Sequence, residues 1–523
     1  MDAVTASDDG PAAAAGGPRR ALVFVGFMGA GKSSAARSAA AALNCEPLDS
    51  DRELERELGE PLETFFDREG EHAFRAREEE AVLRLLARPD ARAIALGGGS
   101  LASQRVREAL RDHTVVLIEV SPEDAWRRAS GKGRPLARDP ERFAQLHRDR
   151  RALYEAHCDA IIPPSDRGVI GRALEALEAL RTQAPAGTKM VWAHSASGAY
   201  PVFAGRGLIA SGFRWPAGGR RFVVSDSNVV TIHRVEGDWP AAAIPAGETE
   251  KTLSRAESIL SQMARVGVAR DDLLVAVGGG VVGDLAGFCA AVYQRGIGVV
   301  QVPTTLVAQV DSAFGGKTGV DLPEAKNYVG AYHQPSAVIV DHAARGTLPA
   351  EERAAGYAEV VKTALIAGGP LWARVRQGEE PDDDVVLGCI RTKLAVVAED
   401  ERDDARRQVL NLGHTIAHAI ESATGYSRYR HGEAVAIGLL GALRLSGRDQ
   451  LRGEVADLFA ARGLPLSFEG PSPDQVIELI GRDKKRRGGR VPFVLVEAPG
   501  EVTPGHHVDE DALRAAIDEV RAR

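Results

Sequence analysis

A glycine-rich loop near the start of the chain carries the residues best suited to phosphate chemistry. Residues 26–33 read GFMGAGKS, which fits the spacing GxxxxGK[ST] and follows the apolar run 21–26. In such a loop the backbone N–H groups turn toward a phosphate, Lys32 reaches its outer oxygens and Ser33 binds Mg²⁺. The helix that follows would direct its positive end at the same anion. The complete motif favours nucleotide binding over the alternative, a glycine-rich turn without a ligand.

Polar residues farther along could bind the phosphate acceptor. Asp49 and Asp51 follow a short apolar run, where two carboxylates could serve Mg²⁺ and a substrate hydroxyl. Taken alone, this segment is more typical of a helix N-cap. Arg75, the three glycines at 97–99 and Arg150 come next. A ligand could approach the glycine backbone, although isolated arginines are usually solvated.

A second glycine-rich turn and a group of histidines lie in the C-terminal half. The apolar strand 273–277 runs into glycines 278–280 and a helix. This turn suits a pyrophosphate, but it departs from the standard dinucleotide fingerprint, and a tight packing turn is an equal alternative.

His414 and His418 stand four residues apart, with His431 downstream and Glu359 upstream. One carboxylate and two imidazoles would leave open positions on a catalytic Zn²⁺, whereas a single histidine is more often structural.

Lysines and arginines gather in the polar and glycine-rich segments of the same half. Each would be a solvated surface residue by default. Several cations in such surroundings instead indicate a phosphate or carboxylate ligand. These cations are Lys317, Lys326, Lys393, Arg407, Lys484 and Lys485.

Strands that alternate with helices must position these residues. Apolar runs at 93–96 and 115–120 follow the first strand, and the second half has strands at 222–225, 273–277 and 299–302. This alternation predicts an α/β fold with parallel sheets covered by helices on both faces. After about residue 347 the pattern becomes mostly helical. We expect a disordered arm at 1–18, a phosphate-loop domain at 19–182, a linker at 183–189, a second α/β domain at 190–346 and a helical domain at 347–523.

Composition narrows the classes of protein that remain. The 523 residues suggest roughly three domains, and a formal charge of −8 argues against a general nucleic-acid binder. No apolar run approaches the ~20 residues of a membrane span, and the N-terminus lacks the apolar core of a signal peptide. The 4 cysteines lie far apart without a CxxC pair, which fits a reducing cytosol. We therefore expect a cytoplasmic protein that binds neither nucleic acid nor membranes.

The N-terminal motifs together resemble the shikimate kinase family over about residues 19–181. The segments GFMGAGKS, LDSD, GEHAFR, LGGG, GRPL and RxxLY occur in the family's order. The resemblance implies ATP-dependent 3-phosphorylation of shikimate, which depends mostly on positioning and electrostatics. It assigns Gly29, Ala30, Gly31, Lys32, Ser33 and Ser34 to the nucleotide, with Ser33 and, through water, Asp49 at Mg²⁺. It assigns Asp51, Arg75, Gly97, Gly98, Gly99 and Arg150 to shikimate, and Lys32, Asp49, Asp51 and the lid residue Arg134 to catalysis. Either Arg127 or Arg128 would lie on the adenine side.

The second half resembles the 3-dehydroquinate synthase family from about residue 190 to the end. The segments PAGETEK, VGGGVVGDLAGF, QVPTTLVAQVDSAFGGKTGVD, GYAEVVK, LNLGHTIAHAIE and RHGEAVAIGL occur in the family's order. The resemblance implies a Rossmann-like NAD-binding domain, a helical metal-binding domain and a lyase reaction. In that reaction 3-deoxy-D-arabino-heptulosonate 7-phosphate becomes 3-dehydroquinate plus phosphate, and NAD returns to its oxidised form in each turnover.

The same resemblance assigns the residues of this second site. The metal, Zn²⁺ or Co²⁺, would be bound by Glu359, His414 and His431. NAD would be bound by Asp226, Asn228, Glu248, Lys251, Gly278, Gly279, Gly280, Asp284, Thr304 and Thr305. The substrate would contact Asp311, Lys326 and Asn327 together with the catalytic residues Lys317, Lys362, Lys393, Arg407, Asn411 and His418. Arg295 would reach the substrate phosphate from the partner subunit of a homodimer, and one of Lys484 and Lys485 would approach it too.

The complete chain is therefore predicted to be a bifunctional shikimate-pathway enzyme. Departures from the families are Ala137 in the lid, Ala313-Phe314, Asp321 and Thr363, which put local packing in doubt. Two alternatives concern the second half: a related sugar-phosphate cyclase, or a metal-dependent alcohol dehydrogenase with a different substrate. A further alternative is a scaffold that has lost catalysis. Such a protein would be expected to lack Lys32, Asp51 or a metal ligand, and none of these is missing. The synthase product is not the kinase substrate, so we expect no direct transfer between the sites.

Overall fold

The computed structural model describes residues 20–130, 139–164, 168–233, 237, 239–486 and 491–522, without the side chains of 482–486. The arm expected at 1–18, the lid residue Arg134 and the side chains of Lys484 and Lys485 therefore lie outside the described residues. The chain divides into two compact units. Unit 1 comprises the residues up to Trp192 with Pro201–Trp215, and unit 2 comprises Ala193–Tyr200 with Pro216–Arg523.

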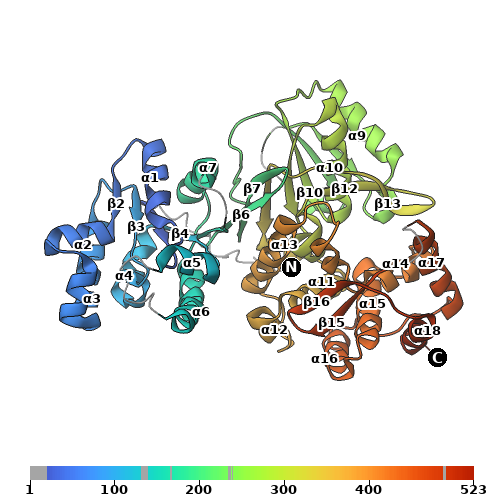
Figure 1. Cartoon of the computed structure of the whole chain (residues 1–523). Coiled ribbons are helices and arrows are strands. Elements are labelled where there is room, and N and C mark those ends of the chain that lie inside the picture. The colour runs from blue at the N-terminus through green and yellow to red at the C-terminus, as the bar shows by residue number, and fades with distance from the viewer. Residues whose placement is uncertain are drawn as a thin grey trace, which may run out of the picture. The chain divides into compact units, whose positions relative to one another are not determined.

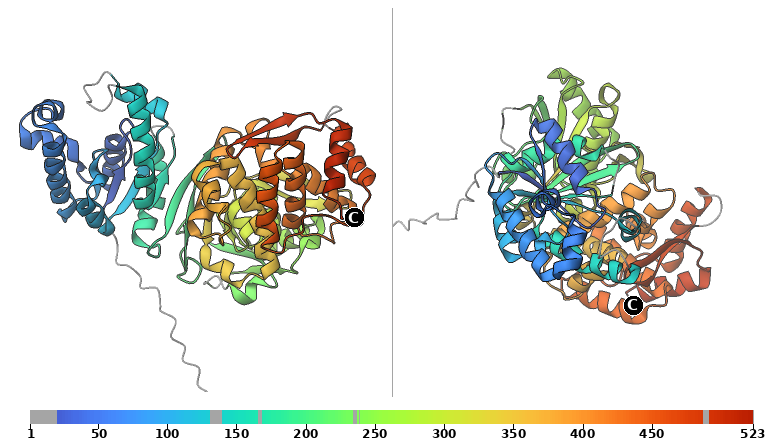
Figure 2. Two further views of the ribbon diagram at one scale, coloured as in Figure 1. Left: turned by 90° about the horizontal axis from the view of Figure 1, so that it is seen from below. Right: turned by 60° about the vertical axis from the view of Figure 1, so that its left-hand side comes forward.

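Unit 1 is a parallel sheet with helices on both faces (Figures 1 and 2). Its strands neighbour one another in the order β2-β3-β1-β4-β5-β6, and every pair is parallel. The central strand β1 is at most 1% exposed along its length, as expected for a parallel strand covered on both sides. The strands are β1 (Leu22–Val25), β2 (Pro47–Asp49), β3 (Ala93–Ala95), β4 (Thr114–Ile118), β5 (Ala160–Ile162), β6 (Lys189–Ser195) and β7 (Gly198–Gly205); the unit boundary passes through β6 and β7. The helices are α1 (Lys32–Leu43), α2 (Ser50–Leu58), α3 (Leu62–Ala87), α4 (Gln104–Ala109), α5 (Pro122–Ala129), α6 (Pro140–His157) and α7 (Val169–Thr182).

The first part of unit 2 contains a second parallel arrangement, with the strand order β14-β11-β10-β8-β9. These strands are β8 (Arg221–Asp226), β9 (Ala241–Ile244), β10 (Leu273–Gly278), β11 (Gly298–Pro303) and β14 (Ala337–Asp341). The helices are α8 (Val229–Ile232), α9 (Leu253–Arg265) and α10 (Gly280–Val292). An antiparallel hairpin of β12 (Lys317–Leu322) and β13 (Ala325–Tyr332) packs against α10.

The second part of unit 2 is helical and is coloured orange to red in Figures 1 and 2. Its helices are α11 (Ala350–Ala367), α12 (Gly369–Val375), α13 (Asp383–Glu399), α14 (His414–Ala423), α15 (His431–Leu445), α16 (Asp449–Ala460), α17 (Pro473–Arg486) and α18 (Glu510–Glu519), with a hairpin of β15 (Phe493–Ala498) and β16 (Glu501–His506). α11 and α15 pack on each other and are buried on nearly all sides, which explains their apolar sequences. None of the helices in the described ranges is both long and apolar enough to cross a membrane.

The predicted fold class is confirmed: each α/β part has a parallel sheet, and the chain is mostly helical after residue 347. Arg75 lies within α3, which begins at Leu62 and is kinked at Gly70, where φ is 81°. The predicted domain boundaries at 182, 189 and 346 stay predictions, because the boundary between the two units passes through β6 and β7 instead.

Two candidate active sites

The glycine-rich loop of unit 1 leaves a helix N-terminus open to an anion. Gly26, Gly29 and Gly31 have φ angles of 142°, 79° and 98°, a region that favours glycine. α1 begins directly after them, and no side chain caps it. The first N–H groups of a helix generally lack acceptors within it, and in α1 the N–H of Ser34 donates to the carbonyl oxygen of Gly31 at 3.0 Å. Nζ of Lys32 lies 3.2 Å from the carbonyl oxygen of Phe27, folded back over the loop. This geometry suits the phosphates of a nucleotide at residues 29–34.

The three glycines after β3 let the predicted acceptor-binding side chains converge. A Cβ on Gly97 would lie 2.7 Å from Oδ1 of Asp51, and one on Gly99 would lie 2.1 Å from Nη1 of Arg75. A Cβ on Gly98 would lie 3.5 Å from the carbonyl oxygen at position 26, the first residue of the phosphate loop. The glycine run therefore joins a carboxylate and a guanidinium to the edge of the nucleotide site.

Two residues that sequence reasoning did not assign support this cluster. The hydroxyl of Tyr154 donates to the carbonyl oxygen of Gly98 at 2.5 Å, and Nη1 of Arg150 donates to the same oxygen at 3.0 Å. Burial raises the pKa of Tyr154 to about 12, so the hydroxyl keeps its proton. Glu78 lies 2.5 Å from Arg75 and orients its guanidinium. The available signals were the tyrosine that ends RxxLY and the spacing of three residues between Arg75 and Glu78.

The structure also separates alternatives that the sequence left open. The side chain of Asp49 accepts from N–H groups of the first turn of α2, so it caps that helix, and its role at Mg²⁺ stays a prediction. Nη1 of Arg128 donates to the carbonyl oxygen of Gly29 at 3.1 Å. Arg127 instead pairs with Asp124 at 2.5 Å and is largely exposed. Arg128 is therefore the arginine beside the phosphate loop.

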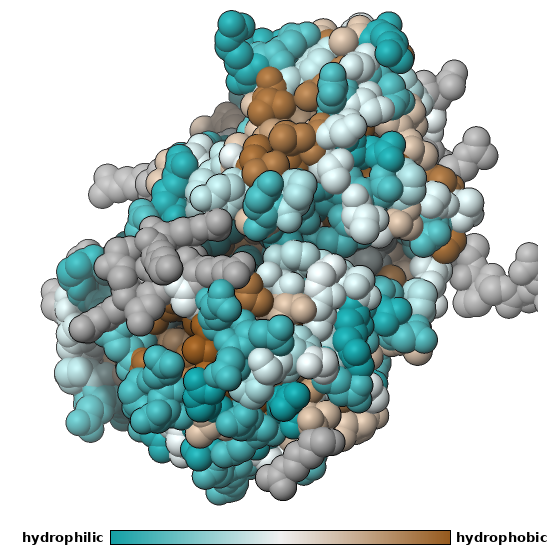
Figure 3. All heavy atoms as spheres, turned by 90° about the vertical axis from the view of Figure 1, so that its right-hand side faces the viewer, coloured by the Kyte–Doolittle hydropathy of each residue, from teal (hydrophilic) through white to brown (hydrophobic). Residues whose placement is uncertain are grey.

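Unit 2 contains a cavity of about 1560 Å³ that the α/β part and the helical part line together. Figure 3 shows a hollow across the middle of the face that it draws, with mostly hydrophilic residues around the hollow. The cavity brings together most residues predicted for the second site: Asp226, Asn228, Glu248, Lys251, Gly279, Gly280, Asp284, Thr304, Thr305, Asp311, Lys317, Lys326, Asn327, Lys393, Arg407, Asn411, His414, His418 and His431.

Among the predicted residues whose side chains are described, four do not line this cavity: Gly278, Arg295, Glu359 and Lys362. A Cβ on Gly278 would lie 2.6 Å from the side chain of Val282, so this glycine serves tight packing of β10 on α10. Arg295 is exposed and has a φ of 68°. Glu359 and Lys362 lie directly behind the cavity wall, at most 1% exposed.

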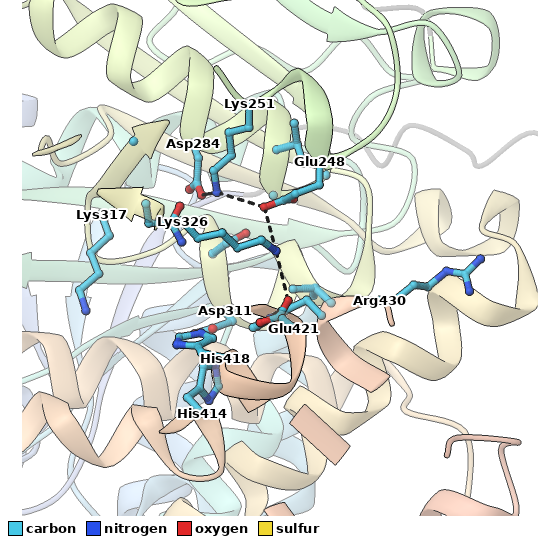
Figure 4. A pocket seen from close by; sticks show the side chains of 18 of the residues that line it. Glu248, Lys251, Asp284, Asp311, Lys317, Lys326, His414, His418, Glu421 and Arg430 are labelled. Carbon is cyan, nitrogen blue, oxygen red and sulfur yellow. Dashed lines mark hydrogen bonds and ion pairs between the residues drawn. The ribbon is translucent and has the colours of Figure 1, made fainter. Parts of the chain in front are cut away.

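The end of the cavity nearest the sheet suits a dinucleotide. α10 begins at Gly280 without a side-chain cap, as α1 does in unit 1. Nζ of Lys251 lies 2.9 Å from Oδ2 of Asp284 and 3.7 Å from Oε1 of Glu248 (Figure 4). Burial opposes the charge of Lys251, but these carboxylates raise its pKa. The N-terminus of α10 and this buried ammonium give the cavity the positive potential that a pyrophosphate requires.

Glu359, His414 and His431 meet at one point with the chemistry of a metal site. Oε1 of Glu359 is buried and lies 3.6 Å from Nε2 of His414 and 3.3 Å from Nε2 of His431. Burial and the nearby Lys362 lower the pKa of His414 to about 3, so its imidazole is neutral and offers a lone pair. Two imidazole nitrogens and one carboxylate oxygen fit a catalytic Zn²⁺ with open positions.

Buried lysines and a carboxylate extend from this point toward the substrate end of the cavity. Nζ of Lys362 lies 2.6 Å from Oε2 of Glu359 and 3.7 Å from Oδ2 of Asp311. Lys393 forms an ion pair with the other oxygen of Asp311. Burial lowers the pKa of Lys393 despite that pair. Arg407 is 1% exposed and donates Nη2 to the carbonyl oxygen of residue 315 at 3.0 Å, which holds the wall of the cavity.

The hairpin of β12 and β13 brings further cations over the cavity. Lys317 pairs with Asp403 at 2.5 Å, and Lys326 lies near the histidines (Figure 4). The departure at Asp321 has a local use, because its Oδ1 accepts from the N–H of Asn327 at 2.7 Å and holds the turn. Asn327 has a φ of 53°, a conformation that asparagine tolerates.

Sequence reasoning missed Glu421, the last residue of the segment LNLGHTIAHAIE. It is 1% exposed, and its Oε1 lies 3.1 Å from Nζ of Lys326 and 3.5 Å from Nδ1 of His431. Figure 4 shows it at the end of a row of charges that starts at Asp284. The signal was its spacing, three residues after His418 and therefore on the same helix face.

Models of known families match both units. The model described as "shikimate kinase" matches residues 28–181. "3-dehydroquinate synthase N-terminal" matches residues 241–355 and "3-dehydroquinate synthase C-terminal" matches residues 356–486. Among curated proteins, a 3-dehydroquinate synthase of Symbiobacterium thermophilum is 41% identical over 356 residues, which are 62% of this chain and 98% of that protein. One of Acidithiobacillus ferrooxidans is 42% identical over 343 residues, 61% of this chain and 94% of that protein.

Solved structures similar to this chain include two synthases with a bound dinucleotide and metal ion. A 2-deoxy-scyllo-inosose synthase complexed with carbaglucose-6-phosphate, NAD⁺ and Co²⁺ is 25% identical and has a TM-score of 0.57; the match covers 64% of this chain and 100% of that one. A 2-epi-5-epi-valiolone synthase from Streptomyces hygroscopicus subsp. jinggangensis, with NAD⁺ and Zn²⁺ bound, is 26% identical with a TM-score of 0.56, covering 61% of this chain and 96% of that one.

Proposed function

Because the chain belongs to the 3-dehydroquinate synthase family and carries a shikimate kinase domain at residues 28–181, we propose that it catalyses two reactions of the shikimate pathway. Unit 1 transfers a phosphoryl group from ATP to the 3-hydroxyl of shikimate. Unit 2 converts 3-deoxy-D-arabino-heptulosonate 7-phosphate to 3-dehydroquinate and phosphate. The enzyme is thus a kinase joined to a lyase.

In unit 1, we assign binding and charge neutralisation to separate groups. The open N-terminus of α1 and Lys32 hold the phosphates of ATP, and Ser33 holds Mg²⁺. Arg75 and Arg150 bind the shikimate carboxylate, since guanidinium groups pair bidentately with carboxylates. Asp51 accepts a hydrogen bond from the reacting hydroxyl. Phosphoryl transfer then depends on this alignment and on neutralised charge rather than on covalent catalysis.

In unit 2, the dinucleotide end and the metal end of one cavity act on the same substrate. The N-terminus of α10 would hold NAD, and Glu359, His414 and His431 would hold Zn²⁺ or Co²⁺. When bound, the metal polarises substrate oxygens as a Lewis acid. The lysines at 317, 326 and 393 bind the phosphate and carboxylate of the substrate, and the helical part encloses it and orients the ring for closure.

One observation carries the proposal for unit 2. A buried carboxylate oxygen faces the Nε2 atoms of two histidines, at one end of a cavity that has an open helix N-terminus at the other. A dehydrogenase acting on a neutral alcohol would not require the cluster of lysines between these two ends. The relatives at 41–42% identity are 3-dehydroquinate synthases, which favours this substrate over those of other cyclases.

We also propose a homodimer formed through unit 2, in the cytoplasm. Arg295 is exposed and does not line the cavity of its own unit, which is consistent with a contribution to the phosphate site of a second copy. Val292, three residues earlier, is 44% exposed, which suits a contact between subunits. The free cysteines at 45, 158, 289 and 389 fit a reducing compartment.

Two assays on the purified full chain test the proposed function. One measures ADP formed from ATP and shikimate with Mg²⁺, and the other measures phosphate released from the heptulosonate phosphate with NAD and Zn²⁺. Lys32→Ala should lower the first activity at least ~100-fold and spare the second, because it removes a charge that stabilises the transferring phosphoryl group. His414→Ala should have the reverse effect. The proposal fails for any unit whose parent activity is absent, and net NADH formation would identify a dehydrogenase instead.

A further inference from the structure

His431 lies between two carboxylates, one on each side of its ring. Nε2 lies 3.3 Å from Oε1 of Glu359, and Nδ1 lies 3.5 Å from Oε1 of Glu421. Both carboxylates are at most 1% exposed, and they come from different helices, α11 and α14. Each ring nitrogen therefore has one defined neighbour.

His414 is arranged in the same way with a different partner. Its Nδ1 lies 3.2 Å from the carbonyl oxygen of Leu412, and its Nε2 lies 3.6 Å from Oε1 of Glu359. A neutral imidazole carries its proton on only one nitrogen. A proton on Nδ1 of His414 leaves the Nε2 lone pair directed toward Glu359. The equivalent proton on His431 requires an acceptor at Nδ1, and the neighbour at that position is Glu421.

We propose that Glu421 is a positioning residue for the metal of unit 2: it holds His431 with the proton on Nδ1, so that Nε2 faces the metal between Glu359 and His414. Histidines that bind metals commonly donate their second N–H to a carboxylate or carbonyl group, which fixes the ring and increases its basicity. The inference rests on the proposed function of unit 2, and it adds a residue to which that function gives no role.

Lys326 explains how a buried carboxylate is kept in this position. Its Nζ lies 3.1 Å from Oε1 of Glu421 and 3.4 Å from Oε1 of Glu248 (Figure 4). The ring of Tyr426 lies below the same ammonium, 4.9 Å from Nζ to the centroid. An isolated buried charge would be strongly unfavourable, whereas a paired one is tolerated. The ion pair thus allows Glu421 to stay ionised beside His431, but it also offers a competing explanation, that Glu421 serves only as the partner of Lys326.

Zinc binding by the metal-free full chain separates these explanations. The Kd for Zn²⁺ is measured by competition with a chromophoric chelator, and the visible spectrum is recorded with Co²⁺. Glu421→Gln should weaken Zn²⁺ binding about 10- to 100-fold, the range found when such outer partners are removed, and should shift the Co²⁺ bands. Glu421→Asp, which keeps the charge, should recover part of the loss.

Glu433→Gln is the matched control. It makes the same change two residues from His431, but the Glu433 carboxylate accepts from the backbone N–H of Arg430 at 2.8 Å and caps α15. This variant should bind Zn²⁺ like the parent. Binding of NAD and the melting temperature of each variant report whether unit 2 remains folded. If the glutamine variant does not fold, the aspartate variant carries the test, with weaker Zn²⁺ binding as the expected result.

Two outcomes would overturn the inference in distinguishable ways. If folded Glu421→Gln binds Zn²⁺ with the parent's Kd and Co²⁺ spectrum, Glu421 is only an ion-pair partner and the positioning role is wrong. If His414→Ala also binds Zn²⁺ like the parent, the metal does not lie between the proposed ligands, and the proposed function of unit 2 fails as well.

Discussion

Replacing Gly99 by alanine should weaken shikimate binding by unit 1 without unfolding it. A Cβ at this position would lie 2.1 Å from Nη1 and 2.6 Å from Cζ of Arg75, well inside van der Waals contact. The backbone itself accepts alanine, because φ of Gly99 is −102°. The obstructed atoms are the end of a flexible side chain, so Arg75 can swing aside at little cost in stability. It cannot keep its present position beside Glu78.

The size of the effect follows from the interaction that Arg75 would lose. A hydrogen bond to a charged group contributes about 1.5–3 kcal/mol, and about 1.4 kcal/mol corresponds to a factor of ten. The KM for shikimate should therefore rise roughly 10- to 150-fold. kcat should fall much less, because the carboxylate of shikimate is bound equally in the ground state and the transition state.

The assay is ADP formation at saturating ATP with shikimate varied. Gly98→Ala is a graded comparison, since its Cβ would meet ordinary contacts, the nearest at 3.5 Å, and should raise the KM less. Gly171→Ala is the matched control, because nothing lies within 4 Å of a Cβ at this position in α7. Phosphate release by unit 2 should be unchanged in all three. A parental KM in folded Gly99→Ala would refute the role of Arg75, and a large fall in melting temperature would refute the argument that its side chain can move aside.

Three further predictions concern unit 2. Lys251→Met should lower the free energy of unfolding by about 1–3 kcal/mol, because the carboxylates of Glu248 and Asp284 lose their partner. An unchanged free energy of unfolding, measured by urea denaturation, would contradict this. Burial by itself would raise the pKa of Asp311, but two buried lysines lower this pKa to about 2. Because this folded pKa is below the unfolded value, the ionised carboxylate stabilises the folded protein above pH ~4, and this stabilisation is lost as the pH falls toward 2. The free energy of unfolding of Asp311→Asn should therefore change less between pH ~4 and pH ~2 than that of the parent; an equal decline in both proteins would contradict this. Dialysis against a metal chelator should abolish phosphate release until Zn²⁺ is restored and spare ADP formation once Mg²⁺ is returned, and retained phosphate release would exclude a required metal.

Features that depend on contiguous residues could be predicted from the sequence. The loop 26–33 combines glycines with a strand before it and a helix after it, and both elements are present as β1 and α1. Backbone conformation and helix formation are decided mainly by neighbours within a few residues. For the same reason the predicted strands at 222–225, 273–277 and 299–302 are present as β8, β10 and β11. The family motifs then indicated which of the many polar residues belong to a site.

Only the tertiary structure decided between residues that are equivalent in local sequence. Arg127 and Arg128 are adjacent on α5, yet one faces solvent and the other reaches the phosphate loop, which is 99 positions away in the chain. Glu421 gains its importance from Lys326, 95 positions away, and from the ring of His431 on another helix. Local propensity carries no information about such distances, because they arise when helices and hairpins pack and exclude water. The sequence by itself therefore determined the fold class and the chemistry of each unit, whereas packing selected which side chains can act together.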